Sequence, residues 1–301
     1  MGRRDSRPPR GRDGHTPGGH KSGGQAPAGK RPLPGGRGPS RPESHESPRR
    51  DAPSRQEIWI YGYHPAAAAL ANPQRKILRI VATAEAAARL REDSSVPADI
   101  SARTHTLGRG DIDQLVGKDA VHQGIAVLVR PLDHNLQDVL GTLEGKADAC
   151  LVLLDQVTDP HNAGAVLRSA AAFGAAAVIA PDRHAPDESG VMAKSASGAL
   201  DKIPYVKTVN LVRAIELIKE RQFWLVALDA AAPAALSSID LGGRIALVLG
   251  AEGEGIRRLV AEACDHQARL PIASAMESLN VSNAAAVALY EKARQIAAKR
   301  K

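Results

Sequence analysis

Four near-continuous apolar runs, separated by stretches with helical patterning, constrain the fold of the second half of this chain. The runs cover residues 150–154, 176–180, 224–228 and 245–249. Strands that are apolar on both faces are typical of a parallel sheet covered by helices on both sides. Helical patterns fit between and after the runs, at residues 163–173, 211–221, 255–264 and 282–299. The pattern therefore predicts an α/β fold built on a parallel sheet.

A smaller α/β unit is predicted ahead of this sheet. Its β-like runs lie at residues 58–63, 76–83 and 124–129, and its helical stretches lie at residues 65–71, 84–92 and 109–116. Pro131 and the polar residues after it interrupt the pattern, and residues 136–144 are predicted to form a short connecting helix. We therefore divide the chain into four parts: a tail (1–56), a small domain (57–131), a linker (132–147) and a larger domain (148–301).

The excess positive charge of the chain lies in the tail. Residues 1–56 carry 13 Lys and Arg against 5 Asp and Glu, whereas the remainder carries 27 against 28, and the whole chain has a net charge of +7. The tail is rich in Gly, Pro, Arg and Ser and offers little apolar surface, so we expect it to be disordered. It fits two interpretations equally: a basic arm that neutralises nucleic-acid phosphates, and a solvated, dispensable extension.

Several classes of protein are disfavoured by composition. No apolar run approaches the length of a membrane helix. Cys150 and Cys264 lack the spacing of a zinc site or of a disulfide framework, and the ten histidines form no HExxH motif. We expect a cytoplasmic protein that has neither a membrane nor a metal partner, although the Arg and Ser content of the tail leaves a transit peptide open.

Polar or glycine-rich loops follow three of the expected strands. They cover residues 158–169, 250–255 and 278–283, and the last follows a short run at residues 270–272 that has the same strand-then-loop form. Ligands of open α/β sheets bind beyond the carboxyl ends of the strands. The three loops therefore predict a single composite site.

The first loop carries an asparagine and an arginine. Asn162 taken alone would be an ordinary helix cap. Arg168 lies six residues further on among small and apolar residues, where it must reach water or be paired, because a buried unpaired charge is costly. Its planar guanidinium suits a phosphate or a carboxylate, and Glu252 of the second loop is a candidate partner.

The other polar segments are less specific. Residues 250–255 match neither GxGxxG nor a P-loop, and a plain strand-to-helix turn explains them as well as a ligand site does. Residues 278–283 hold two serines and two asparagines, more than helix capping needs, which fits a ligand with hydroxyls, amides or base edges. Residues 194–199 either extend this surface or cap a helix, and His122 is expected to have a structural role in a turn.

At these loops the chain resembles a known family. In order and in spacing, residues 158–169, 247–255 and 270–283 resemble motifs one, two and three of the SpoU (TrmH-like) RNA ribose 2′-O-methyltransferases. Residues 58–131, which contain the segment Val121-His122-Gln123-Gly124, resemble the family's small RNA-binding domain of the ribosomal protein L30e type. The segment 159–162 is most similar to the branch that methylates a guanosine of large-subunit (23S) rRNA, and the tRNA-modifying branch shares the three motifs.

The resemblance implies a fold, a cofactor and a set of site residues. The catalytic domain would be of the SPOUT type, with a deep trefoil knot, and the active site would form at the interface of a homodimer. S-adenosylmethionine would be held by the backbone at Gly250, Leu270 and Leu279. The matching polar catalytic residues are Asn162, Arg168, Glu252, Ser278 and Asn280.

We expect this site to transfer a methyl group to a ribose 2′-hydroxyl of RNA. Guanidinium stays protonated up to about pH 12, so we expect Arg168 to hold the target phosphate and stabilise alkoxide charge rather than to abstract the proton. Asn162 and Glu252 would orient Arg168, and Ser278 and Asn280 would position the ribose or the cofactor. Three alternatives remain: a tRNA guanosine 2′-O-methyltransferase, a non-catalytic RNA-binding or ribosome-assembly protein, and a nucleotide-binding enzyme unrelated to RNA.

Overall fold

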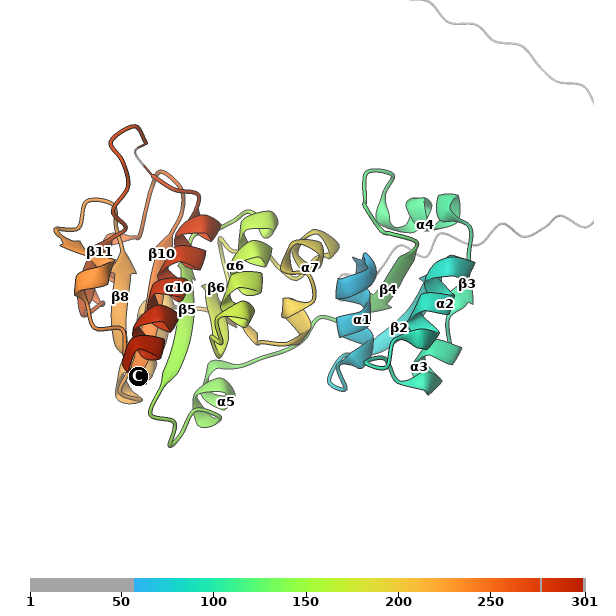
Figure 1. Cartoon of the computed structure of the whole chain (residues 1–301), viewed down its shortest axis with the longest axis horizontal. Helices are drawn as coiled ribbons and strands as arrows, with labels where there is room; N and C mark the ends of the chain where they lie inside the picture. Colours follow the sequence, from blue (N-terminus) through green and yellow to red (C-terminus); the bar gives the residue numbers. More distant parts are fainter. Residues whose placement is uncertain (1–56, 277, 300–301) are drawn as a thin grey trace, which may run out of the picture. The chain divides into compact units, whose positions relative to one another are not determined.

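Two β-sheets organise this protein, whose computed structural model describes residues 57–276 and 278–299. The first is a mixed sheet of four strands, and the second is a parallel sheet of seven (Figure 1). The α/β class predicted from the sequence is therefore confirmed. The predicted disorder of residues 1–56 falls outside the described residues.

The small domain is built on the four-stranded sheet, with strand order β1-β4-β2-β3. Its strands are β1 (Ile58–Tyr61), β2 (Ile77–Ala82), β3 (His105–Thr106) and β4 (Ile125–Val129). Strand β4 runs antiparallel to both β1 and β2, whereas β3 runs parallel to β2. The helices are α1 (Tyr63–Ala71), α2 (Ala84–Glu92), α3 (Ala98–Ala102) and α4 (Arg109–Val116).

Two elements of the small domain were missed by the sequence reasoning. Helix α3 has five residues and strand β3 has two, so neither is long enough to show a helical or an alternating period. The longer elements begin and end within two residues of their predicted bounds. Helix α2, for example, begins after Thr83, whose side chain accepts a hydrogen bond from the Ala86 amide.

The larger domain contains the parallel sheet, with strand order β7-β6-β5-β10-β8-β11-β9. Its strands are β5 (Ala149–Asp155), β6 (Ala177–Pro181), β7 (Tyr205–Thr208), β8 (Trp224–Leu228), β9 (Ala234–Ala235), β10 (Arg244–Gly250) and β11 (His266–Arg269). All neighbouring pairs are parallel. The four predicted apolar runs form β5, β6, β8 and β10, and every residue of β5 is buried.

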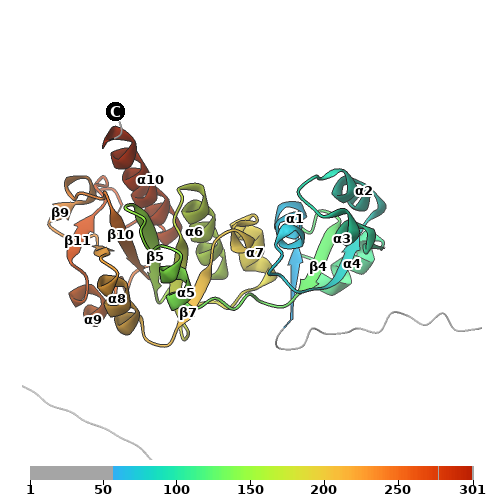
Figure 2. The ribbon, with the colours of Figure 1, turned by 90° about the horizontal axis from the view of Figure 1, so that it is seen from below.

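Helices cover both faces of the parallel sheet, as its apolar strands require. Residues 150, 152 and 154 of β5 pack with α6 (Pro160–Ala172) and α10 (Val281–Lys299), whereas Leu151 and Leu153 pack with α5 (Leu136–Gly141), α8 (Leu211–Glu220) and α9 (Arg258–Glu262). Figure 2 shows α6 and α10 on one side of the sheet and α8 and α9 on the other. Helix α7 (Gly190–Ala196) lies against α6. In the described part of the chain, no helix is long and apolar enough to cross a membrane.

The prediction of a strand at residues 270–272 is wrong. Strand β11 ends at Arg269, and residues 270–272 belong to the loop that follows. Pro271 has no N–H to contribute to a sheet ladder. The preceding residues, His266 to Arg269, are mostly polar and exposed, so they gave no apolar signal for the real strand. The loop nevertheless follows a strand end, as the composite site requires.

A buried ion-pair cluster joins the small domain to the larger one. The Arg75 guanidinium donates to Glu188 and to Asp201, each at 2.7 Å, and the exposed fractions of the three side chains are 0%, 5% and 2%. Arg75 also donates to the carbonyl oxygen of Arg130 at 3.1 Å. Burial raises the pKa of the Glu188 carboxyl, while the neighbouring Arg75 opposes that rise. The cluster is therefore a buried electrostatic contact between the two domains.

Candidate active site

Helix α6, which carries the residues of the first polar loop, begins earlier than predicted. Asp159 is the cap, because its carboxylate accepts a hydrogen bond from the His161 amide at 3.0 Å. Pro160 occupies the first helical position, where its missing N–H costs nothing. Asn162 therefore does not open the helix, and its side chain is free to make a contact outside α6.

The second polar loop is a tight turn that closes on itself. Ala251 and Gly255 exchange two backbone hydrogen bonds, of 3.1 and 3.0 Å. Strand β10 ends at Gly250, where an added Cβ would lie 2.1 Å from the Gly255 carbonyl carbon. Only glycine fits at position 250 unless the loop backbone moves.

An ion pair that the sequence reasoning missed anchors the end of this loop. The fully buried Asp155, the last residue of β5, accepts hydrogen bonds from the Arg257 amide and the Arg257 Nε, both at 2.9 Å. The Arg257 Nη2 lies 2.7 Å from the same carboxylate. The sequence did hold a signal for this ion pair. Asp155 is an acidic residue at the end of an otherwise apolar strand, and a buried carboxylate must find hydrogen-bond donors.

Side chains from all three loops meet at Glu252. Its Oε1 accepts a hydrogen bond from the Asn280 Nδ2 at 2.6 Å and another from the Asn162 Nδ2 at 3.1 Å. The Asn280 Nδ2 also donates to the Asn162 Oδ1 at 3.0 Å. The structure thus brings together three of the five polar residues expected at the site, in one network of charge-assisted and amide hydrogen bonds.

Asn280 has a second role, at the start of α10. Its Oδ1 accepts hydrogen bonds from the Ser282 amide at 2.9 Å and the Ser282 hydroxyl at 2.6 Å. One end of the amide therefore caps the helix, while the other end donates to Glu252. This division of roles fixes the orientation of the Asn280 side chain.

Arg168 and Ser278 stand apart from this network. Both are exposed, and neither side chain makes a hydrogen bond or an ion pair within residues 57–276 and 278–299. The expected pairing of Arg168 with Glu252 is therefore wrong for the single chain. Six residues along a helix rotate a side chain by about 600°, so Arg168 and Asn162 point in directions roughly 120° apart.

A cavity of about 420 Å³ lies at this end of the parallel sheet. Gly250, Leu270 and Leu279, the three residues expected to hold a cofactor, all line it, and so do Glu252 and Ser278. Further lining residues are Leu228, Asp229, Leu249 and Ile256. The cavity is large enough for a small organic ligand, and its walls combine apolar side chains with three carboxylates, those of Asp229, Glu252 and Glu254.

Thiolate chemistry has no support at either cysteine. Burial raises the pKa of the Cys150 thiol and of the Cys264 thiol to about 12, so both stay protonated at neutral pH. Within the residues that the structure describes, no group of three or more His, Cys, Asp or Glu side chains could hold a metal ion.

The fold and the cavity are those of a two-domain, cofactor-binding protein. The larger domain is a parallel α/β domain with a ligand-sized cavity at its strand ends, and a mixed-sheet domain precedes it. Family comparisons specify that class. Residues 149–290 match the model of the SpoU rRNA Methylase family, and residues 59–134 match the model described as RNA 2′-O ribose methyltransferase substrate binding. The chain belongs to the SpoU family of RNA 2′-O-ribose methyltransferases, which confirms the resemblance seen in the three motifs.

Curated relatives cover most of the described chain. The 23S rRNA (guanosine-2′-O-)-methyltransferase RlmB of Bordetella pertussis is 43% identical over 64% of this chain and 78% of its own length. RlmB of Coxiella burnetii is 38% identical over 78% of this chain and 95% of its own length. The solved SpoU methyltransferase AviRb from Streptomyces viridochromogenes, in complex with AdoMet, aligns with a TM-score of 0.67 and 22% identity. That alignment covers 81% of this chain and 92% of AviRb, and it concerns the fold.

The chain is thus an S-adenosylmethionine-dependent transferase that methylates ribose 2′-hydroxyls of RNA. The cavity fits this cofactor. Its apolar wall of Leu228, Leu249 and Ile256 suits an adenine ring, and the carboxylate of Asp229 suits hydroxyl or ammonium groups. The closed loop at Gly250 brings backbone to the cavity wall without an intervening side chain.

Proposed function

We propose that this protein methylates the ribose 2′-hydroxyl of a guanosine in 23S rRNA. The observation that carries the proposal is the network of Asn162, Glu252 and Asn280 beside the cavity lined by Gly250 and Leu279. The rRNA target is supported by relatives named for it, at 43% and 38% identity. Such a substrate implies a cytoplasmic site of action. We also propose that the chain is divided into a tail (1–56), a small domain (57–131), a linker (132–147) and a larger domain (148–301).

The residues of the chain would position the substrate and stabilise charge. The sulfonium of the cofactor supplies an electrophilic methyl group. Glu252 accepts hydrogen bonds from the side-chain amides of Asn162 and Asn280 and from the Val281 backbone N–H, and we propose that this fixed carboxylate and Asn280 orient the ribose. Ser278, which is exposed on the cavity wall, would donate a hydrogen bond to ribose or cofactor.

Arg168 would hold the target phosphate and stabilise the alkoxide charge that develops on the 2′-oxygen. Its exposed, unpaired guanidinium in the described chain supports this role, because a charge already neutralised by Glu252 would be less available to an anion. We therefore propose that Arg168 acts as an electrostatic clamp and that proton abstraction falls to another acceptor.

A homodimer is part of the proposal. Exposed apolar side chains lie on α6 and α10, the helices beside the site: Phe173, just after α6, and Val287 and Tyr290 of α10. The rings of Phe173 and Tyr290 meet edge to face, with centroids 6.1 Å apart. Such an apolar patch is suited to a second copy of the chain. A trefoil knot in the larger domain likewise stays a prediction, supported by family membership.

Methyl transfer from labelled S-adenosylmethionine tests the proposal. The acceptors would be 23S rRNA and tRNA, each purified from a strain that lacks this gene. The 23S rRNA would also be supplied within ribosomal precursor particles. We expect label in 23S rRNA at one nucleotide. Label confined to tRNA would assign the protein to the tRNA-modifying branch, and the absence of transfer to every acceptor would favour a non-catalytic RNA-binding protein.

A further inference from the structure

Helix α7 contacts both domains. On one side it packs against α6, and on another it contacts strand β1 of the small domain. Both contacts are made at glycines, where no side chain separates the two segments. An added Cβ at Gly164 of α6 would lie 2.5 Å from the Met192 carbonyl oxygen, and one at Gly190 of α7 would lie 2.4 Å from the Trp59 carbonyl oxygen. Because no side chain can rotate to absorb a displacement there, a movement of β1 would be passed on to α6.

Lys194, in the last turn of α7, contacts a turn of the small domain. Its Nζ donates a hydrogen bond to the Gln123 Oε1 at 3.0 Å, and the same oxygen accepts one from the Tyr63 amide at 3.1 Å. The Lys194 Nζ also occupies the space beside Gly62, where an added Cβ would lie 2.5 Å from it. Burial lowers the pKa of the Lys194 ammonium, and no carboxylate pairs with it within residues 57–276 and 278–299. The neutral side chain of Gln123 is therefore its partner between the two domains.

The backbone of this turn fixes the Gln123 side chain. Gln123 has a φ of 54°, in the left-handed region that residues other than glycine rarely adopt. The buried His122 holds the turn, because its Nδ1 accepts a hydrogen bond from the Gly124 amide at 3.1 Å and its Nε2 donates to the Asp113 Oδ1 at 2.9 Å. The structural role predicted for His122 is thus confirmed. A residue that its surroundings keep in a rarely adopted conformation suggests a function, and here that conformation places the amide oxygen against Lys194.

A second hydrogen bond joins α7 to the first turn of α6. The Ser195 Oγ lies 3.1 Å from the His161 Nδ1. His161 directly precedes Asn162, whose side chain belongs to the network with Glu252. Contacts therefore run without a gap from the turn that contains Gln123, through α7, to the polar residues of the methyl-transfer site.

We propose that α7 transmits the position of the small domain to the methyl-transfer site, and that Gln123 and Lys194 are positioning residues for the transfer step. Their hydrogen bond sets the position of α7, and α7 in turn sets the first turn of α6, which carries Asn162. Neither Gln123 nor Lys194 lines the cofactor cavity, so both act through α7. The inference rests on the role proposed above for the network of Asn162, and it makes correct seating of the small domain a condition for fast transfer.

A double-mutant cycle in the full-length protein tests the contact. The variants are Gln123→Ala, Lys194→Met and the two combined, and kcat and KM are measured with S-adenosylmethionine and the RNA that the wild-type protein methylates. We expect each single substitution to lower kcat by about 10- to 100-fold, because misplacing groups that align the reactants has effects of this size. The double variant should be no slower than the slower single variant, and the KM for S-adenosylmethionine should stay unchanged. Gln123→Glu keeps an acceptor for both donors and should restore kcat. Additive losses, or an equal loss in Gln123→Glu, would overturn the proposal.

Amide hydrogen exchange of the free protein gives a second readout, which does not depend on turnover. We expect Gln123→Ala and Lys194→Met to raise exchange in peptides that cover α6, because its first turn loses a support. Exchange in α8, on the other face of the sheet, should stay as in the wild-type protein. Unchanged exchange in α6 would overturn the proposal even if kcat falls. Circular dichroism and urea unfolding curves establish that the variants fold.

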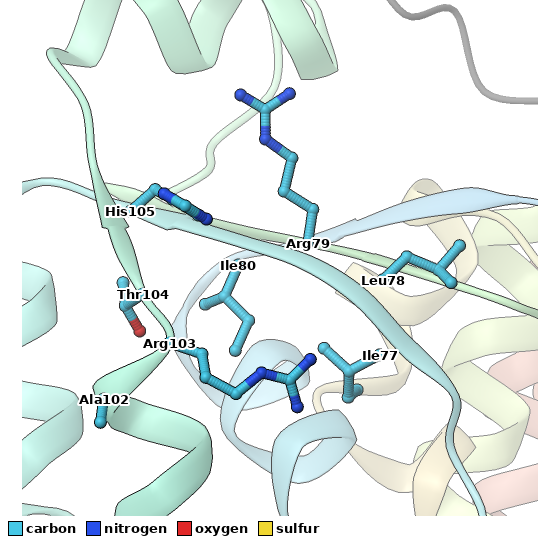
Figure 3. Close-up of a pocket in the computed structure, with 8 residues that line it drawn as sticks. All are labelled: Ile77, Leu78, Arg79, Ile80, Ala102, Arg103, Thr104 and His105. Atoms are coloured by element: carbon cyan, nitrogen blue, oxygen red, sulfur yellow. The ribbon is translucent and has the colours of Figure 1, made fainter.

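Two control variants separate the role of α7 from a general effect of the small domain. Asn72→Ala removes a hydrogen bond to Asp201, 3.2 Å long, that joins the two domains without involving α7. Arg103→Gln alters a cavity of about 410 Å³ beside β2 that is lined by small-domain residues alone, where Figure 3 shows Arg103 extending toward Ile77 and Ile80. Both variants should keep the wild-type kcat and the wild-type exchange of α6. If Asn72→Ala lowers kcat as much as Gln123→Ala does, any weakening of the domain contact suffices and α7 has no special role.

Exchange and turnover together separate this inference from the proposed function. Raised exchange of α6 in the two variants, with no methyl transfer by the wild-type protein to any RNA, would refute the proposed function alone. Transfer to 23S rRNA by the wild-type protein, with the same kcat in Gln123→Ala and Lys194→Met, would refute the role of α7 alone.

Discussion

At the scale of single residues, Asn280 links the helix cap to the catalytic network. Asn280→Asp keeps an acceptor for the Ser282 amide but replaces the donor that lies 2.6 Å from Glu252 with an acceptor. The two carboxylates would repel each other, so we expect methyl transfer to fall by about 10²–10³ while the unfolding free energy changes little.

The matched control for this prediction is Asn283→Asp, which adds the same charge one turn further into α10 at an exposed position. Initial rates at saturating RNA and S-adenosylmethionine provide the measurement. If both variants lose activity equally, the general negative charge is responsible and the Asn280 donor has no special role.

Glycine 250 shows how one residue determines the path of a loop. A methyl group at this position would lie 2.1 Å from backbone atoms of Gly255, so Gly250→Ala must displace the closed loop. We expect overpacking to cost about 1–3 kcal/mol of unfolding free energy and to weaken cofactor binding at least as strongly. Isothermal titration with S-adenosylmethionine measures the binding, and Gly110→Ala, where an added Cβ meets no atom within 4 Å, should bind normally.

At the scale of elements, the long buried strands were the predictable part of the fold. Strands β5, β6, β8 and β10 are apolar except for Asp155 at the end of β5 and Arg244 at the start of β10, and such runs predict a parallel sheet. Strand β11 and helix α7 were not predicted, because they are short and carry polar residues. Their positions depend on tertiary packing, which local patterning does not encode.

The candidate site was predictable in its residues but only partly in its contacts. The motif positions of Asn162, Glu252 and Asn280 led to one network, as expected. The partner expected for Arg168 was wrong, because helix geometry turns this side chain away from Asn162. Asp155 was missed because an acid ending a strand carries no motif of its own.

The buried Asp155 links strand β5 to Arg257, which follows the loop at residues 250–255. Asp155→Asn keeps the size of the side chain but loses the charge that Arg257 contacts, so we expect a loss of about 1.5–3 kcal/mol in unfolding free energy. Glu262→Gln, which breaks the exposed pair with Arg258, should cost about 0–1 kcal/mol. Urea unfolding followed by circular dichroism compares the two, and equal costs would mean that burial of Asp155 adds nothing.

At the scale of the whole molecule, the Arg75 cluster is a buried contact between the small domain and the larger one. Arg75→Met would leave Glu188 and Asp201 buried without their cation, so we expect a loss of about 3–5 kcal/mol. Arg75→Lys retains the charge without the fork and should fall between this variant and the wild-type protein. A differential scanning calorimetry trace for Arg75→Met that matches the wild-type trace would show that the cluster contributes no net stability.

The whole molecule therefore combines an RNA-binding domain with a methyl-transfer domain, joined through buried charges. The cofactor cavity and the loop network both belong to the larger domain and share Glu252. This arrangement predicts that substitutions in the small domain away from α7 affect RNA affinity, whereas substitutions at the three loops affect the transfer step.

The most direct test of the central claim is to identify the atom that receives the methyl group. The substrate is 23S rRNA from a strain that lacks this gene. It is incubated with S-adenosylmethionine and either the full-length protein or its Arg168→Ala variant, digested to nucleosides and analysed by mass spectrometry. The account predicts one equivalent of 2′-O-methylguanosine, formed by the wild-type protein at a rate about 10²–10³ times that of the variant. Methylation of a base, or equal 2′-O-methylation by both proteins, would contradict it.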